Sequence, residues 1–260
     1  MKKFNILITN YNRNTHFKIC LNYLFKNLGI KTVGDKIKHD VSLSFLPFND
    51  KFGIIDGKFC KSIVLNKLIE KMSDDFDYLI QLDCDLIVRP DLLDIIINED
   101  KDWLVLGGLK LSEKSTRAIF DDEIPYEYIE KMEVENSSRE INSRKGFVGN
   151  IAVKKECYLK YLEITKQKEL YDPRFIGWGG EDSVLSITST HMANNNLITK
   201  KYLPDAWRHM WHEKETEKPG FDNKQFDKNC DLMSRLVGEN VKKMQEYING
   251  RTSRPEPVYN

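Results

Sequence analysis

Short apolar runs alternate with helical patterns through the first half of the chain, and this alternation limits the fold more than any other feature. Strand-like apolar runs occupy residues 4–9, 41–46, 78–82 and 103–106. Helices are expected between them, around residues 16–28, 58–72 and 91–97. Strands that alternate with helices are typical of an α/β domain built on a mostly parallel sheet with helices on its faces. The sequence therefore predicts this fold class.

The second half of the chain is patterned differently. Residues 112–145 are polar, acidic and aperiodic in the middle, which indicates a functional or mobile loop. The regular pattern resumes at residue 146. After a charged connector that contains Pro219 and Gly220, one amphipathic helix is predicted from the apolar positions Phe226, Cys230, Met233, Val237, Val241, Met244 and Ile248. We expect a main domain over 1–214, a helical extension over 215–250 and a flexible tail over 251–260.

Composition narrows the classes of partner and the compartment. Among the 260 residues, 40 Lys and Arg balance 40 Asp and Glu, so no global field attracts nucleic acid or anionic membranes. No segment reaches the about 20 apolar residues that a membrane-spanning helix needs. The five cysteines form no CxxC pair, which favours a reducing compartment. We expect a cytoplasmic protein, with peripheral attachment to the inner face of the membrane as the alternative.

The first motif that carries chemistry is Asp83-Cys84-Asp85, directly after the apolar strand at 78–82. Ligands of open α/β sheets bind at the carboxyl ends of the strands, where two carboxylates two residues apart can meet one hard cation and a sugar hydroxyl. A lone motif of this kind is more often a polar turn. Here apolar residues flank it on both sides, and unpaired buried charge is costly, so a metal ion would stabilise it.

The second motif is the segment 175–182, in which three glycines surround Trp178 and precede Glu181 and Asp182. Glycines permit a tight backbone path and close approach of a ligand. The acidic pair is expected to begin a helix, whose N-terminus favours negative charge. The alternative is a glycine turn with acidic helix capping and no ligand.

The third motif places His209 and His212 three residues apart. Such a pair can lie on one helical face or flank a turn and bind one metal ion, although most isolated pairs with this spacing bind none.

These segments resemble the metal-dependent GT-A glycosyltransferases, in particular the beta-1,4-galactosyltransferase group and its bacterial relatives. The resemblance extends over nearly the whole chain, in order: Asn12-Arg13, Phe59-Cys60-Lys61 with Asn66, Asp83-x-Asp85, Phe147 to Asn150, Gly177 to Asp182, and Arg208 to His212. The chain departs from the family at Lys61, which replaces an arginine, at His209, which replaces a more frequent methionine, and at Ser183-Val184, which replaces an acidic run.

The resemblance implies a GT-A (Rossmann-like) fold, mixed but mostly parallel, with a nucleotide-sugar half at about 1–110 and an acceptor half at about 146–214. It implies a UDP-sugar donor and a saccharide or glycoconjugate acceptor, as in polysaccharide biosynthesis. By resemblance, the nucleotide site comprises Arg13, Phe59, Lys61 and Asp83. The acceptor and sugar site comprises Trp178, Gly179, Gly180 and Glu181. The resemblance further implies a manganese ion, or alternatively magnesium, with Asp85, His212 and His209 as its ligands.

The chemistry of sugar transfer agrees with these assignments. A divalent cation at the diphosphate acts as Lewis acid, and a carboxylate on the opposite face of the sugar takes the proton of the acceptor hydroxyl. Asp182 is the expected base, with Glu181 beside it as a second catalytic residue, and one base with one metal implies inversion. A base must be ionised, so we expect Asp182 to be accessible and outside any closed ion pair. For Lys61, the alternative to a nucleotide contact is a solvated helix lysine.

Other functions stay open at this point. A metal-dependent phosphodiesterase or other hydrolase could use Asp83, Asp85, His209 and His212, although it has no use for the glycine-rich segment. A sugar-binding protein without activity would not need the full set of carboxylates. Transfer to an acceptor other than a saccharide, including modified DNA, is a further alternative, but the neutral charge does not support DNA.

Overall fold

The computed structural model describes residues 1–28, 39–45, 52–135, 149–177, 179–213 and 221–252. A seven-stranded sheet forms the centre, with strand order β2-β1-β5-β8-β7-β9-β6. Its strands are β1 (Lys3–Thr9), β2 (Asp40–Phe45), β5 (Tyr78–Asp83), β6 (Leu86–Val88), β7 (Trp103–Lys110), β8 (Ile151–Lys154) and β9 (Lys200–His209). A separate two-stranded pair joins β3 (Ile54–Ile55) to β4 (Lys58–Phe59).

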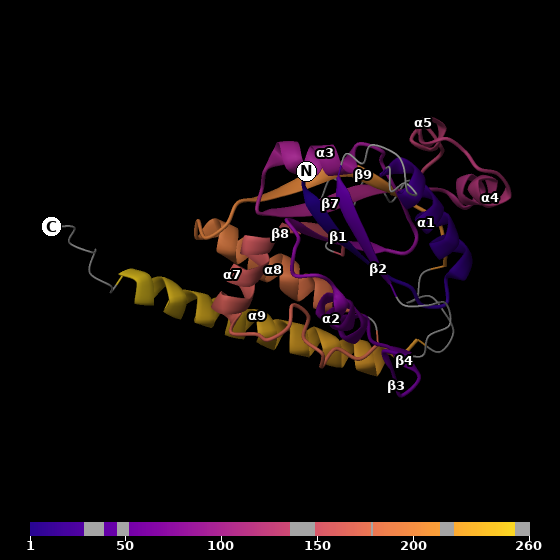
Figure 1. Ribbon diagram of the computed structural model, residues 1–260. Helices are drawn as coiled ribbons and strands as arrows, with labels where there is room; N and C mark the ends of the chain where they lie inside the picture. The colour runs from indigo at the N-terminus through magenta and orange to yellow at the C-terminus, as the bar shows by residue number, and fades with distance from the viewer. Residues whose placement is uncertain (29–38, 46–51, 136–148, 178, 214–220, 253–260) are drawn as a thin grey trace.

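Helices cover both faces of this sheet (Figure 1). The described helices are α1 (Asn14–Asn27), α2 (Lys61–Lys71), α3 (Leu92–Glu99), α4 (Glu113–Asp121), α5 (Tyr126–Ile129), α7 (Lys155–Thr165), α8 (Glu181–Asn194) and α9 (Asn223–Thr252). In Figure 1, α3 lies above the sheet and α1 to its right, while α2, α7 and α8 lie below it and α9 runs beneath them.

The sheet is mixed, as predicted. β1 pairs in parallel with β2 and β5, and β7 pairs in parallel with β9. The antiparallel pairs are β5 with β8, β7 with β8, and β6 with β9. Antiparallel pairing therefore enters through β6, β8 and β9, which the apolar pattern of the sequence did not reveal.

The core has two parts because successive side chains of a strand point to opposite faces. Ile6 and Ile8 of β1 pack with α1 and α3 on one face, whereas Leu7 packs with α2, α7 and α8 on the other. β7 follows the same rule, with Leu104 on the first face and Trp103 on the second. Strands buried on both faces have nearly continuous apolar sequences, which is why the sequence revealed β1, β5 and β7.

Two predictions for the second half of the chain have different outcomes. The prediction that 112–145 lacks regular structure is wrong for the described part, because α4 and α5 lie within it. The Ser112 hydroxyl accepts a hydrogen bond from the Ser115 N–H and caps α4, and Ile119 and Ile129 anchor the two helices in the core. The predicted C-terminal helix is confirmed, and it is a single helix of 30 residues.

The contacts of α9 tie it to the main domain. It packs against α7 and α8, and its Met244 is buried in the same core cluster as Trp103. Leu232 and Leu236 form a smaller cluster with Phe175 and Val184. Within the described part of the chain, no helix has both the length and the apolar character needed to cross a membrane.

Candidate active site

The Asp83-x-Asp85 motif lies at the carboxyl end of β5, an inner strand of the sheet, as expected for a ligand site. Asp83 is the last residue of β5, and Asp85 precedes β6 and is fully buried. Asn150, just before β8, holds Asp83 from two sides. Its Oδ1 accepts the Asp83 N–H at 2.8 Å, and its Nδ2 donates to Asp83 Oδ2 at 3.3 Å. No role of Asn150 was predicted from the sequence beyond its place in the segment 147–150, which resembles the glycosyltransferase family.

Asp85, His209 and His212 come together, as predicted. Each offers one ligand atom, and these atoms lie within 4.8 Å of one another. His209 Nε2 is 3.5 Å from Asp85 Oδ1, and His212 Nε2 is 3.2 Å from Asp85 Oδ2. His209 ends β9, and His212 follows the strand, so the helical alternative for this histidine pair is wrong. The antiparallel register of β6 and β9 sets Leu86 opposite His209, which brings the two motifs together.

The chemistry of this trio fits a divalent cation. Asp85 Oδ1 and His212 Nε2 are buried and lack a hydrogen-bond partner among the described residues. Burial, the larger effect, lowers the pKa of His209 and keeps its imidazole neutral, although Asp85 opposes this shift. Burial also disfavours the Asp85 carboxylate, but nearby positive charge outweighs it, from His209 and His212 in their protonated forms and from the Arg13 guanidinium, and the pKa of Asp85 lies well below its usual range. Neutral imidazoles and a charged carboxylate are the forms that bind metals.

Two residues of the α1 region surround the trio. Arg13, which precedes α1, forms an ion pair with Asp85. His16 Nε2 lies 3.0 Å from the backbone oxygen of Trp211, and so holds the segment that carries His212. The sequence assigned Arg13 to the nucleotide, and its side chain lies beside the candidate metal site. His16 was not predicted to lie near this site, because no local sequence pattern distinguishes that histidine.

Lys61 joins the two acidic motifs. Its Nζ lies 2.9 Å from Asp83 Oδ1 and 2.9 Å from Asp182 Oδ2. Burial opposes its charge, but Asp182 and Asp83 outweigh this and raise the pKa of Lys61 well above its usual value. The alternative of a solvated helix lysine is therefore wrong. The lysine begins α2, and its partner Asp182 is 121 residues away in sequence.

The prediction of an accessible, unpaired Asp182 is also wrong. Its side chain is 19% exposed and is paired with Lys61. Burial raises the pKa of Asp182, while Lys61 opposes the shift. The neighbouring Glu181 is buried, and burial together with the Asp182 charge raises the pKa of Glu181 to about 7. The site thus holds a dense set of acidic groups around the Lys61 ammonium group.

The glycine-rich segment begins α8 as predicted. Gly180 precedes the helix with φ +101°, and a Cβ there would lie 2.5 Å from the Phe175 ring. Gly179 has φ +97°, and a Cβ there would lie 2.9 Å from Phe226 of α9. Only glycine fits both the backbone and the space. Trp178, predicted to contact the sugar, lies outside the described residues.

Phe59, the remaining predicted nucleotide residue, lies at the edge of this site. Its ring stacks on Tyr11, with centroids 4.9 Å apart and planes 5° apart. Tyr11 follows β1 and is 37% exposed, so the stacked pair presents one aromatic surface beside Arg13 in the chain. The sequence identified Phe59 by resemblance but gave no role to Tyr11.

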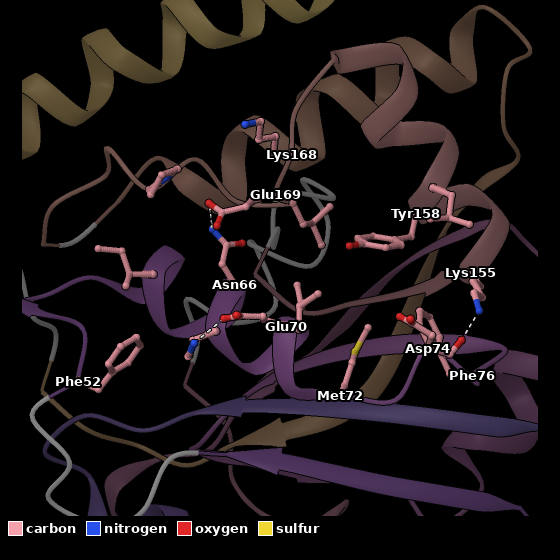
Figure 2. A pocket seen from close by; sticks show the side chains of 16 residues that line it. Phe52, Asn66, Glu70, Met72, Asp74, Phe76, Lys155, Tyr158, Lys168 and Glu169 are labelled. Carbon is pink, nitrogen blue, oxygen red and sulfur yellow. Dashed lines mark hydrogen bonds and ion pairs between the residues drawn. The ribbon is translucent and has the colours of Figure 1, made fainter.

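A separate cavity of about 560 Å³ lies between α2 and α7 (Figure 2). Its lining includes Asn66, Glu70, Met72, Tyr158 and Glu169. None of the predicted site residues lines it. The candidate active site is therefore defined by its converging charged side chains and not by this cavity.

Comparisons with known proteins identify the fold. A scan against protein families and a search of curated proteins find no match. Among solved structures, the chain is similar to the catalytic domain of Drosophila beta-1,4-galactosyltransferase 7 in complex with xylobiose, with 15% identity and a TM-score of 0.51 over 90% of this chain and 80% of that one. It is also similar to S. aureus TarS 1–349, with 11% identity and a TM-score of 0.51 over 98% and 73%. The predicted GT-A fold is thus confirmed.

Proposed function

We propose that the protein is an inverting, metal-dependent glycosyltransferase that moves a hexose from a UDP-sugar to a hydroxyl of a saccharide. The observation that carries this proposal is the bridge made by Lys61. One ammonium contacts Asp83 of the donor motif and Asp182 of the glycine-rich motif, each at 2.9 Å. For transfer, the donor site and the general base must lie close enough to reach the same sugar, because the attacked carbon sits between them. The shared contact with Lys61 brings Asp83 and Asp182 to such a separation.

Asp182 is the proposed general base. It takes the proton of the acceptor hydroxyl while the oxygen attacks the anomeric carbon and the bond to the diphosphate breaks. Attack from the face opposite the leaving group inverts the configuration of that carbon. Lys61 lies against Asp182 Oδ2 and favours its ionised form, which a base requires.

The remaining residues divide between donor and acceptor. Arg13, Phe59, Lys61 and Asp83 are proposed to bind the nucleotide and its diphosphate, and the stacked Tyr11 extends the aromatic surface of Phe59. A divalent cation held by Asp85, His209 and His212 would supply Lewis-acid stabilisation of the diphosphate leaving group. Glu181, with Trp178, Gly179 and Gly180, is proposed to bind the sugar and the acceptor.

The decisive experiment is a turnover assay with UDP-galactose, UDP-N-acetylgalactosamine and UDP-glucose, with and without Mn²⁺, on oligosaccharide acceptors that include xylobiose. We expect one donor to give a glycosylated acceptor of inverted configuration. Release of free hexose with no dependence on the acceptor would instead indicate a hydrolase. The same assay on modified DNA tests an acceptor other than a saccharide.

The matched variants are Asp182→Asn and Asp77→Asn. Asp182→Asn keeps the shape of the side chain but cannot accept a proton, so kcat should fall by ~10² or more while UDP-sugar binding persists. Asp77 is also paired with a lysine, Lys2. It directly precedes β5, at the end of that strand opposite to Asp83 and the active site. Its variant should keep near-normal kcat. Near-normal turnover by Asp182→Asn would make Glu181 the next candidate for the base.

A further inference from the structure

Gln81 is a buried amide in the strand that leads to the active site. It is 1% exposed, and a buried amide is stable only when its donors and acceptors have partners. Its Nε2 donates to the backbone oxygen of Gly149 at 2.6 Å and lies 3.4 Å from Asp182 Oδ1. Its Oε1 accepts a hydrogen bond from the Tyr171 hydroxyl. The amide therefore faces Asp182 with its donor side.

Tyr171 is held firmly enough to fix this orientation. It is buried, and the Asn66 amide binds its backbone on both sides, accepting from the N–H at 3.1 Å and donating to the carbonyl at 2.7 Å. Asn66 in turn donates to Glu169 at 3.0 Å, a contact visible in Figure 2. Burial raises the pKa of Tyr171 well above its usual value, so its hydroxyl keeps its proton and donates.

We propose that Tyr171 and Gln81 form an orienting pair that holds the Asp182 carboxylate in place and in its ionised form. Neither residue touches the reacting atoms, so both are positioning residues. The Tyr171 hydroxyl occupies the acceptor end of the Gln81 amide, and this leaves only the donor end for Asp182. A flipped amide would set Oε1 against Asp182 Oδ1 and against the Gly149 carbonyl, and both contacts are repulsive. The proposal rests on the proposed function, in which Asp182 is the base.

The charges around Asp182 explain why such a pair is needed. Lys61 contacts Oδ2 and favours the ionised form, whereas Asp83 and Glu181 disfavour it. Gln81 is the neutral donor on the other carboxylate oxygen, Oδ1. Gly149 leaves no side chain in this space, since a Cβ there would lie 3.1 Å from Asp182 Oδ2. Both oxygens of the carboxylate are therefore held, one by a charge and one by an oriented amide.

The test compares Gln81→Met and Tyr171→Phe with the unaltered protein and with a control, Tyr23→Phe. Tyr23 is also buried, and its hydroxyl donates to the Ile124 carbonyl at 2.5 Å. It lies in the core cluster on the opposite face of the sheet from Tyr171. The titration of Asp182 is followed by NMR with ¹³C-labelled aspartate, and its signal is assigned with Asp182→Asn. Thermal unfolding confirms that each variant is folded.

Gln81→Met should raise the pKa of Asp182 by about one unit, because it removes the donor to Oδ1. Tyr171→Phe should raise it by less, because in that variant Gln81 Nε2 keeps its hydrogen bond to the Gly149 carbonyl. The acid limb of the kcat profile should move to higher pH by the same amount, with a loss of about tenfold per unit below the new pKa. Donor affinity should not change. Tyr23→Phe should alter none of these quantities.

An unchanged Asp182 titration in folded Gln81→Met and Tyr171→Phe would overturn the proposal. This arm needs no substrate, so it gives a result even if the protein transfers no sugar. Transfer by the unaltered protein with an unchanged titration would refute the orienting pair alone. A shifted titration without any transfer would refute the proposed function alone.

Discussion

At the scale of single residues, Glu181 links the site to stability. Burial raises the pKa of Glu181 to about 7 from an ordinary value of 4.5. The folded protein therefore binds more protons than the unfolded chain between these pH values, and its free energy of unfolding falls as pH rises through this range. A shift of this size corresponds to about 3 kcal/mol between the two ends.

Glu181→Gln should remove this dependence because glutamine stays neutral at every pH. We expect the variant to gain stability relative to the unaltered protein as pH rises from 5 to 8, by up to about 3 kcal/mol. Urea unfolding at both pH values measures this difference. Glu169→Gln serves as control, because Glu169 is exposed and lies outside the carboxylate cluster, where it accepts a hydrogen bond from Asn66. A constant difference between Glu181→Gln and the unaltered protein at both pH values would contradict the prediction.

The residue-scale prediction for the metal concerns His212 and His209. His212→Ala and His209→Ala should each weaken Mn²⁺ binding, measured by calorimetry without substrate, by at least about tenfold. Excess chelator should abolish transfer, and Mn²⁺ should restore it better than Ca²⁺, because Ca²⁺ prefers oxygen ligands to imidazole. His191→Ala, on α8 and outside the trio, is the control. Equal Mn²⁺ affinity in all three variants would exclude this metal site.

Sequence patterns predicted which residues meet, but not how they pair. Asp85 and the two histidines were identified as metal ligands by the resemblance of their motifs to those of a known family. The Lys61 ion pair with Asp182 joins residues 121 positions apart, so it depends on tertiary packing that no local pattern encodes. The expectation of a free base failed for the same reason.

At the scale of elements, α9 supports the glycine-rich segment that begins α8. Asn229 of α9 is buried, and its Nδ2 donates to the Ile176 carbonyl at 2.9 Å. Asn229→Ala would leave that carbonyl without this donor and loosen the segment. We expect a higher acceptor KM with unchanged donor affinity, and a loss of about 1–3 kcal/mol in unfolding free energy.

Asn240 provides the matched control on the same helix. It is also buried, and it donates to the Thr188 hydroxyl at 3.3 Å, at a distance from the glycines. Asn240→Ala should lower stability similarly and leave the acceptor KM unchanged. Steady-state kinetics and urea unfolding separate the two variants. An equal rise in acceptor KM in both would show that α9 acts only through stability.

The burial patterns of the strands show why sequence analysis predicted some of them and missed β6 and β9. β1 and β5 are buried on both faces and have apolar sequences, so the pattern reveals them. β9 mixes exposed and buried residues without a regular alternation. It also contains Pro204 and Asp205, the latter with φ +56°, so its sequence resembles a loop. β6 has three residues. Strands that are short or interrupted become strands only because neighbours supply hydrogen-bond partners.

At the scale of the whole molecule, the two core clusters share one sheet, so the active-site edge depends on both. Trp207 of β9 lies in the cluster with α1 and α3, and Trp103 of β7 lies in the cluster with α7 and α9. β7 and β9 are adjacent and parallel. Loss of packing on either face should therefore destabilise the strand end that carries His209.

This arrangement predicts that α9 unfolds together with the sheet and not as a separate extension. Met244 is 1% exposed in the cluster with Trp103, so Met244→Ala should cost about 2–5 kcal/mol. Tryptophan fluorescence follows the sheet, and far-ultraviolet circular dichroism follows the helices. Both should show one transition, and Met244→Ala should lower both midpoints equally, whereas exposed Glu239→Ala should change neither by more than about 0.5 kcal/mol. Two separate transitions, with only the helical one moved by Met244→Ala, would instead establish 215–250 as an independent unit.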